Sequence, residues 1–211
     1  CNMIQAEHIC KQYTNHNHTV YAVDDVSFTI AEHERVGIAG GSGSGKSTLL
    51  RLIAMLEKPT SGTLRLFGED IWQIQNHTEI YRSLQMMFQN PLAIIPPRMN
   101  LEAFLLEPYI NYGLMDMAEA KEDIRKWIQH VDLPGSIIQK YPHEVSGGQL
   151  QRVVLARIML MKPKLVLFDE PTSALDAVNQ KLVLDLLQKL HTEQPFALSL
   201  IHISEPTRRY A

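Results

Sequence analysis

The sequence has little cysteine, no long apolar run and no marked excess of either charge. Its two cysteines, Cys1 and Cys10, have no metal-like partners nearby, which predicts reduced, cytosolic thiols rather than disulfides or a metal site. No apolar run is long enough to span a bilayer and no signal peptide is visible, but the first residue is not Met, so we expect a few residues to precede it. The net charge of −3 and the scattered basic residues argue against nucleic-acid binding.

What the sequence contains is typical of a globular protein. Hydrophobic residues make up 45% and charged residues 20% of its 211 positions, which is enough for a core in one domain with a subdomain. Strands are predicted at 3–11, 22–30, 35–39, 63–67, 84–89 and 164–168, and helices at 46–56, 148–161 and 178–190. Apolar and aromatic residues at helical spacing predict a helical insertion over 92–141, whose aromatics belong to its core. This order indicates an α/β fold with a mostly parallel, covered sheet.

The most informative segment has the phosphate-binding loop pattern G-x-x-x-x-G-K-[ST] and reads Gly40-Gly41-Ser42-Gly43-Ser44-Gly45-Lys46-Ser47-Thr48. Its glycines let successive backbone N–H groups form an anion-binding nest. Lys46 can reach the β- and γ-phosphates, and Ser47 offers a hydroxyl to Mg²⁺. The loop lies between a predicted strand and a predicted helix, whose N-terminal dipole would face the phosphates. A flexible Gly/Ser linker is the alternative, but a linker needs neither Lys-Ser-Thr nor an apolar helix.

A second motif ends the apolar strand at 165–168 with two acidic residues. Asp169 can hold the hydration shell of Mg²⁺ opposite the phosphate loop, and Glu170 is placed to orient or deprotonate an attacking water. Surface acids after a strand are the alternative when this motif is taken alone.

A third motif, Val145-Ser146-Gly147-Gly148-Gln149, comes directly before a predicted helix. Glycines after a serine form a second backbone nest at a helix N-terminus. A single chain has no use for two phosphate nests around one nucleotide, so this nest is expected to serve the ATP of a partner subunit.

Together these motifs resemble the nucleotide-binding subunit of ABC transporters. The resemblance implies a P-loop NTPase (RecA-like) core with a mostly parallel sheet, an N-terminal antiparallel β part and a helical insertion. It places the nucleotide-binding domain at 1–197, with the core at 1–91 and 142–197 and the helical subdomain at 92–141. In the third motif the family usually has Leu at the position of Val145.

The resemblance also carries site residues onto this chain. It implies that the chain binds ATP and Mg²⁺. Ser47, Gln89 and Asp169 would hold the metal ion, and Glu170, Lys46 and Gln89 would act in hydrolysis. The third motif is the signature motif of the family, and its residues Ser146, Gly147, Gly148 and Gln149 would contact the nucleotide. Asp176 of the turn 173–176 would contact it as well. Tyr13 matches the aromatic that stacks on adenine, with Tyr21 as the fallback and an ordinary surface tyrosine as the alternative.

The implied function is ATP hydrolysis that powers solute import. The dipeptide, oligopeptide and nickel importer group is resembled by Gln85-Met86-Met87-Phe88-Gln89-Asn90-Pro91 followed by Pro97-Arg98-Met99, and by Tyr141-Pro142-His143-Glu144, although 93–97 departs from its pattern. The expected partners are a second ABC ATPase, identical or different, in a head-to-tail dimer, a transmembrane permease and, indirectly, an extracytoplasmic solute-binding protein. The expected location is peripheral, on the cytoplasmic face of the cell membrane. The alternatives are a soluble, non-transport ABC ATPase and an ATP-binding module without hydrolysis.

The end of the chain departs from the family. The family expects an apolar strand that ends in a switch histidine, and Leu198 to His202 has this form, but Ile203 follows where the family has an acid. Leu198 to Arg208 also resembles the translation of a transposase-based sequencing adaptor. We therefore expect 198–211 to be a non-native tail, with His202 matching the switch position by chance and the native protein continuing differently.

Overall fold

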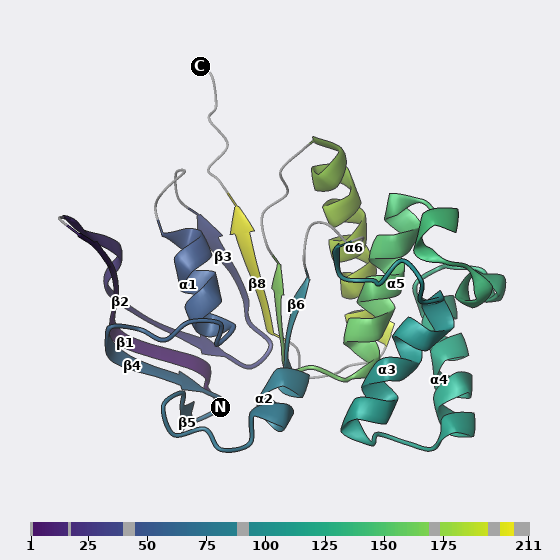
Figure 1. Cartoon of the computed structure of the whole chain (residues 1–211), viewed down its shortest axis with the longest axis horizontal. Coiled ribbons are helices and arrows are strands. Elements are labelled where there is room, and N and C mark those ends of the chain that lie inside the picture. The colour runs from purple at the N-terminus through teal and green to yellow at the C-terminus, as the bar shows by residue number, and fades with distance from the viewer. Residues whose placement is uncertain are drawn as a thin grey trace. The chain divides into compact units, whose positions relative to one another are not determined.

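The computed structural model describes residues 2–16, 18–39, 45–87, 93–168, 174–193 and 199–204 (Figure 1). The chain divides into two compact units. The first contains Cys1–Met86, Lys164–Glu170 and Ala197–Ala211, and the second contains Met87–Pro163 and Pro171–Phe196. The domain limits expected from the sequence, with a helical subdomain at 92–141, stay a prediction.

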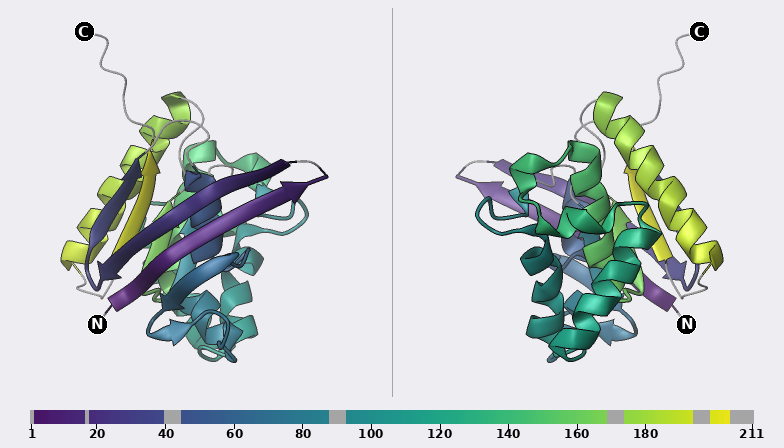
Figure 2. Two further views of the ribbon diagram at one scale, coloured as in Figure 1. Left: turned by 90° about the vertical axis from the view of Figure 1, so that its left-hand side faces the viewer. Right: turned by 90° about the vertical axis from the view of Figure 1, so that its right-hand side faces the viewer.

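The first unit begins with an antiparallel sheet, as expected from the family resemblance. Its four strands lie in the order β2 (His18–Ala31), β1 (Asn2–Asn15), β4 (Ser61–Leu66) and β5 (Glu69–Asp70). β1 and β2 form the long purple hairpin at the front of the left view in Figure 2. The two strands extend beyond the predicted limits of 3–11 and 22–30, because cross-strand pairs continue as far as Asn15 and His18.

A second sheet of the first unit has the order β3 (Arg35–Ala39), β8 (Ser199–Ser204), β7 (Leu165–Phe168) and β6 (Leu84–Met87). β8 pairs in parallel with both β3 and β7, placing the backbone of His202 beside Gly37 and Phe168. All four residues of β7 are buried, as expected for a parallel strand that is covered on both faces. The proposed foreign origin of 198–211 stays a prediction.

The core of the first unit joins helix α1 (Lys46–Ile53) to strands of both sheets. Leu50, Leu52 and Ile53 of α1 are buried in one cluster with residues such as Ile9 of β1 and Leu165 of β7. The helix ends three residues earlier than predicted, and Met55 just beyond it has a left-handed φ of 60°. Helix α2 (His77–Ser83) begins at Asn76, whose side chain accepts a hydrogen bond from the N–H of Glu79.

The second unit contains the helices α3 (Leu101–Tyr112), α4 (Met117–His130), α5 (Gly147–Leu160) and α6 (Ala174–Glu193), with the 3₁₀ turns η2 (Gly135–Gln139) and η3 (Pro142–Glu144). Asn100 caps α3 and Asp116 caps α4, which explains where these two helices begin. Phe104, Tyr109 and Trp127 are buried, as predicted for the aromatics of this region, whereas Tyr141 at its end is exposed. Across the ranges that the structure describes, no helix has both the length and the apolar character needed to cross a membrane.

A proline inside α3 is compensated by an arginine of α5. Pro108 has no N–H to donate to the carbonyl of Phe104, one helical turn earlier. Arg157 supplies the missing donor, because its Nη1 lies 2.9 Å from that carbonyl oxygen and its Nη2 lies 3.0 Å from Glu107 Oε1. The guanidinium carbon is also 4.2 Å from the centre of the Phe104 ring. The Arg157 side chain therefore supplies a donor to the Phe104 carbonyl of α3 and attaches α3 to α5.

We expect Arg157→Met to lower the free energy of unfolding by about 1–3 kcal/mol, because it leaves the half-buried Phe104 carbonyl without its donor. The loss should be smaller in a Pro108→Ala background, where the restored N–H can bond to Phe104 within the helix. Urea unfolding of the four proteins measures both losses. Equal losses in the two backgrounds would show that Arg157 does not replace the missing helical donor.

Candidate nucleotide site

The N-terminus of α1 has no side-chain cap. Its cap residue is Gly45, which forms no side-chain cap, and the first turn contains no acidic residue. The N–H groups at the start of α1 therefore lack the side-chain acceptor that Asn100 gives α3 and Asp116 gives α4.

Gly45 is fixed tightly against β2. Its φ is 85°, and a Cβ built on it would lie 1.9 Å from the carbonyl oxygen of Ala22 and 3.7 Å from Val23. No larger residue fits there without moving the backbone, so the last glycine of the predicted phosphate loop is required by both conformation and space. The earlier loop residues, Gly40 to Ser44, lie outside the described residues.

The next three residues place a cation and hydroxyls at this helix start. Lys46 is 9% exposed and Thr48 is 6% exposed, whereas Ser47 faces solvent. A positive charge at a helix N-terminus is opposed by the helix dipole, and a bound anion would offset that opposition. The residues described here thus fit a phosphate group, and the exposed hydroxyl of Ser47 fits a hard cation such as Mg²⁺.

The two strands that lead into the predicted nucleotide motifs end at the same edge of their sheet. β3 and β7 both run parallel to β8, where Ala39 pairs with Ser204 and Phe168 pairs with His202. Ala39 precedes the phosphate loop and Phe168 precedes Asp169 and Glu170, so both motifs begin at one sheet edge. The acids themselves lie outside the described residues, as does Gln89, and the side chains of Asp176 and His202 are not described.

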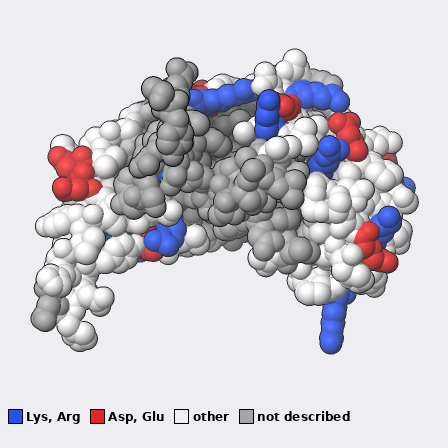
Figure 3. Space-filling model, turned by 90° about the horizontal axis from the view of Figure 1, so that it is seen from above, with Lys and Arg blue, Asp and Glu red and all other residues white. Residues whose placement is uncertain are grey.

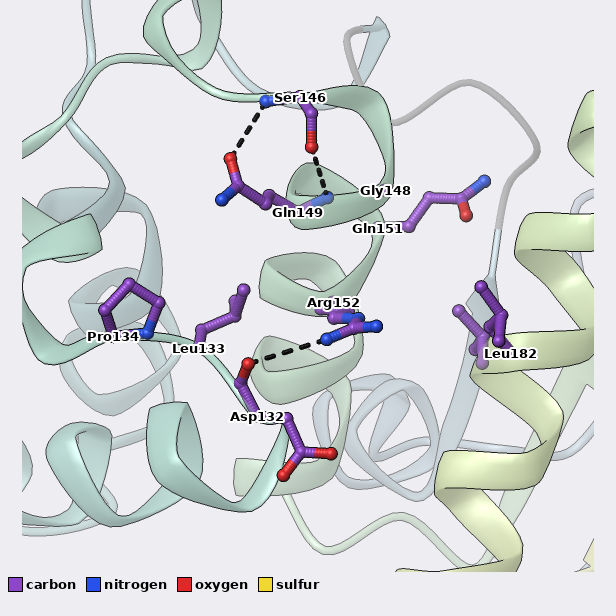
Figure 4. Close-up of a pocket in the computed structure, with 10 residues that line it drawn as sticks. Asp132, Leu133, Pro134, Ser146, Gly148, Gln149, Gln151, Arg152 and Leu182 are labelled. Atoms are coloured by element: carbon purple, nitrogen blue, oxygen red, sulfur yellow. Dashed lines mark hydrogen bonds between the residues drawn. The ribbon is translucent and has the colours of Figure 1, made fainter.

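The signature motif forms the cap of α5. Ser146 Oγ accepts a hydrogen bond from the N–H of Gln149 at 3.2 Å, and Gln149 Oε1 accepts one from the N–H of Ser146 at 3.0 Å (Figure 4). This capping box uses the N–H groups of Ser146 and Gln149, and it leaves those of Gly147 and Gly148 at the first two helical positions. A Cβ on Gly147 would meet nothing within 4 Å, so packing within the described chain does not require glycine there. The nest is open to a group from outside.

A pocket of about 250 Å³ flanks this cap within the second unit. In Figure 4 the capping box lies at its upper end, and Gln151 and Arg152 extend toward Leu182 of α6. Gln151 is 7% exposed and its Oε1 has no hydrogen-bond partner among the residues that the structure describes, while Arg152 Nη1 is 3.5 Å from the carbonyl oxygen of Asp132. Polar groups therefore continue from the nest along α5.

The predicted adenine platform, Tyr13, is held by its hydroxyl. That hydroxyl donates to the carboxylate of Glu57, just beyond α1, and the ring is 40% exposed. Tyr21, the fallback, is 56% exposed and is adjacent to Ala22, the residue that lies against Gly45. The choice between them stays a prediction.

Charge does not gather on the described part of the face drawn in Figure 3. Basic and acidic side chains are interspersed there. Elsewhere among the described residues, ion pairs such as Lys121–Glu102 and Lys126–Glu122 also bring opposite charges together. The described surface on that face therefore lacks the continuous basic patch that nucleic-acid binding requires.

Sequence reasoning missed two features of the site. The capping box has a sequence signal, because Ser146 to Gln149 fits the pattern S-x-x-Q, and it could have been found. Glu57 carries no such signal, since it lies 44 residues from Tyr13 and belongs to no motif.

Comparison with known proteins identifies the family. The family model described as "ABC transporter" matches residues 23–173, and the chain belongs to this family. It is 39% identical to the oligopeptide transport ATP-binding protein AppF of Bacillus subtilis over 188 residues, which are 88% of this chain and 56% of AppF. It is 38% identical to the di/tripeptide transport ATP-binding protein DppF of Pseudomonas aeruginosa over 187 residues, 88% of this chain and 57% of DppF. The expected resemblance to peptide-transport ATP-binding proteins is confirmed, and the chain spans less than two thirds of these relatives.

Solved structures confirm the fold class. The ATP-binding cassette MJ0796, described as a dimer in a post-hydrolysis state bound to ADP and Pi, has a TM-score of 0.76 and 30% sequence identity. The match covers 96% of this chain and 88% of that one. CbiO1 from Clostridium perfringens has a TM-score of 0.80 at 22% identity over 97% of this chain and 79% of that one, and shows the fold alone.

Proposed function

We propose that this chain is an ATP-binding and ATP-hydrolysing subunit that powers solute import by an ABC transporter, of the peptide or nickel type. The observation that carries the proposal is the start of α1, where Gly45 is held tightly against β2, no side chain of the cap residue closes the helix N-terminus, and Lys46 is nearly buried. The names of the relatives AppF and DppF support peptides as the solute class.

ATP would bind with its phosphates at the N-terminus of α1. The N–H groups there, with Lys46, would hold the β- and γ-phosphates. Mg²⁺, when bound, neutralises charge on the transferring phosphoryl group, and Ser47, Asp169 and Gln89 are the residues that would hold it. Glu170 would orient the attacking water and accept its proton.

The second nest, at Gly147 and Gly148, would close on the γ-phosphate of ATP held by another subunit. Its two N–H groups are left over by the capping box, and nothing described within 4 Å fills the space beside Gly147. A head-to-tail dimer of ATPase subunits, identical or different, follows, and the dimeric description of MJ0796 agrees with it. The other partners we propose are a membrane permease and, through it, an extracytoplasmic solute-binding protein, with this subunit peripheral on the cytoplasmic face of the membrane.

Two substitutions of Ser146 separate its structural role from this proposed contact. Aspartate caps a helix as well as serine, so Ser146→Asp should leave the free energy of unfolding nearly unchanged, whereas Ser146→Ala should lower it by about 1 kcal/mol. The aspartate would nevertheless repel the γ-phosphate, and we expect about tenfold slower hydrolysis or more.

Urea unfolding and phosphate release measure these two effects. A fluorescent ATP analogue should bind Ser146→Asp as tightly as the unchanged chain, because each subunit keeps its own phosphate loop. Full hydrolysis by Ser146→Asp would contradict the role of the second nest.

A further inference from the structure

The carboxylate of Glu57, just beyond the end of α1, contacts three side chains. Glu57 accepts the hydroxyl hydrogen bond of Tyr13, lies 3.0 Å from Arg51 Nε and lies 3.6 Å from Lys11 Nζ. The Glu57 side chain is 26% exposed and that of Lys11 is 18% exposed, so these contacts are partly shielded from water. The hydrogen bond from Tyr13, followed by the charges of Arg51 and Lys11, holds the pKa of Glu57 below its usual range. The Glu57 carboxylate is therefore ionised at neutral pH and accepts the hydrogen bond of Tyr13. It loses its charge only when the pH falls below its lowered pKa.

The surrounding contacts fix the Tyr13 side chain. Lys11 Nζ donates to the carbonyl oxygen of Lys58 at 2.8 Å and lies 5.4 Å from the centre of the Tyr13 ring. The N–H of Gln12 donates to Thr60 Oγ1 at 3.0 Å, which attaches β1 to the same connection. A tyrosine has only two side-chain torsions, so a fixed hydroxyl leaves its ring little freedom.

The Tyr13 side chain extends from β1 toward the connection that follows α1. Lys11 and Tyr13 of β1 both contact Glu57 in that connection, and Ile9, earlier in β1, is buried in the core with α1. Tyr13 is paired with Val20 on β2, two residues from Ala22, which lies against Gly45. The spacings of a β-sheet put the Cα atoms of Tyr13 and Ala22 roughly 8 Å apart. An extended nucleoside triphosphate covers such a distance between its phosphates and its base.

We propose that Glu57 is a positioning residue that sets the Tyr13 ring for stacking on the base of the nucleotide. In this arrangement α1 holds the phosphates at its N-terminus, and the connection after its C-terminus orients the platform for the base. The inference rests on the proposed ATP-binding function and deepens it. The competing role for Glu57 is purely structural, as an attachment between β1 and the end of α1.

Two ligands distinguish these roles: ATP, and inorganic tripolyphosphate, which has no base. Calorimetric titration of the whole chain gives both affinities. We expect Tyr13→Ala to weaken ATP about tenfold or more and Glu57→Ala to weaken it about three- to tenfold, with tripolyphosphate unchanged in both. Glu57→Gln keeps an acceptor for the Tyr13 hydroxyl and should restore most of the ATP affinity. In the Tyr13→Ala background, Glu57→Ala should have no further effect.

The control is Glu122→Ala, which removes a glutamate from an exposed ion pair on α4 and should change neither affinity. An equal loss of ATP and tripolyphosphate affinity in Glu57→Ala would overturn the positioning role in favour of a structural one. An unchanged ATP affinity in Tyr13→Ala would also overturn it, but the proposed function would stand because both ligands still bind. If the unchanged chain bound neither ligand, the proposed function itself would fail.

Discussion

Glu170→Gln is expected to slow ATP hydrolysis by a factor of about 10² to 10⁴ and to leave ATP binding intact. Glutamine keeps the size of the side chain and can still hydrogen-bond to a water, but it cannot accept the proton of the attacking water. The prediction rests on the sheet: β7, which Asp169 and Glu170 follow in the sequence, ends at Phe168, at the same edge as β3, which the phosphate loop follows.

Phosphate release under saturating ATP measures the rate, and a fluorescent nucleotide measures binding. The matched control is Glu122→Gln, the same change in an exposed glutamate of α4, which should hydrolyse ATP at the rate of the unchanged chain. Undiminished hydrolysis by Glu170→Gln would contradict the role proposed for this residue.

Lys46→Met should weaken ATP binding by about ten- to a hundredfold. The side chain is 9% exposed at the start of α1, and a hydrogen bond to a charged group contributes about 1.5–3 kcal/mol. Methionine keeps most of the aliphatic length, so packing in the first turn changes little. Lys46→Arg should not restore binding, because the planar guanidinium is larger and differs in shape from an ammonium group.

Calorimetric titration with ATP tests this prediction. The control is Lys126→Met, which removes a lysine that is 61% exposed on α4 and should leave the affinity unchanged. An unaltered affinity in Lys46→Met would show that the open N-terminus of α1 is not where the phosphates bind.

The local parts of the fold could be predicted because short patterns determine them. β3 has its predicted limits, 35–39, and α1 begins at Lys46 as predicted, since strand, glycine loop and helix start are all encoded within one short segment. The helix predicted at 148–161 is observed at 147–160, because the N-cap is set by Ser146 and its box partner Gln149. The fold class followed from the same motifs.

The long-range parts could not be predicted from patterns. Nothing local in β8 specifies that it lies between β3 and β7, and nothing in β1 specifies that Cys10 pairs with Ser61. Such pairings depend on the whole set of strands that compete for each edge. The contact between Tyr13 and Glu57 arises in the same way, because the pairing of β1 with β4 brings the end of α1 beside a distant strand.

The central claim is that each ATP is held by the phosphate loop of one subunit and the signature nest of another. Mixing two impaired proteins tests it most directly: Lys46→Met, which should hold ATP only weakly, and Gly148→Asp, which should not complete its partner's site. An acid in the first turn of α5 is compatible with the helix dipole, so Gly148→Asp should remain folded and bind ATP. Each protein alone should release little phosphate, and the mixture should regain hydrolysis because one composite site in each mixed dimer is intact. Full activity of Gly148→Asp alone, or a mixture no more active than its parts, would contradict the shared site.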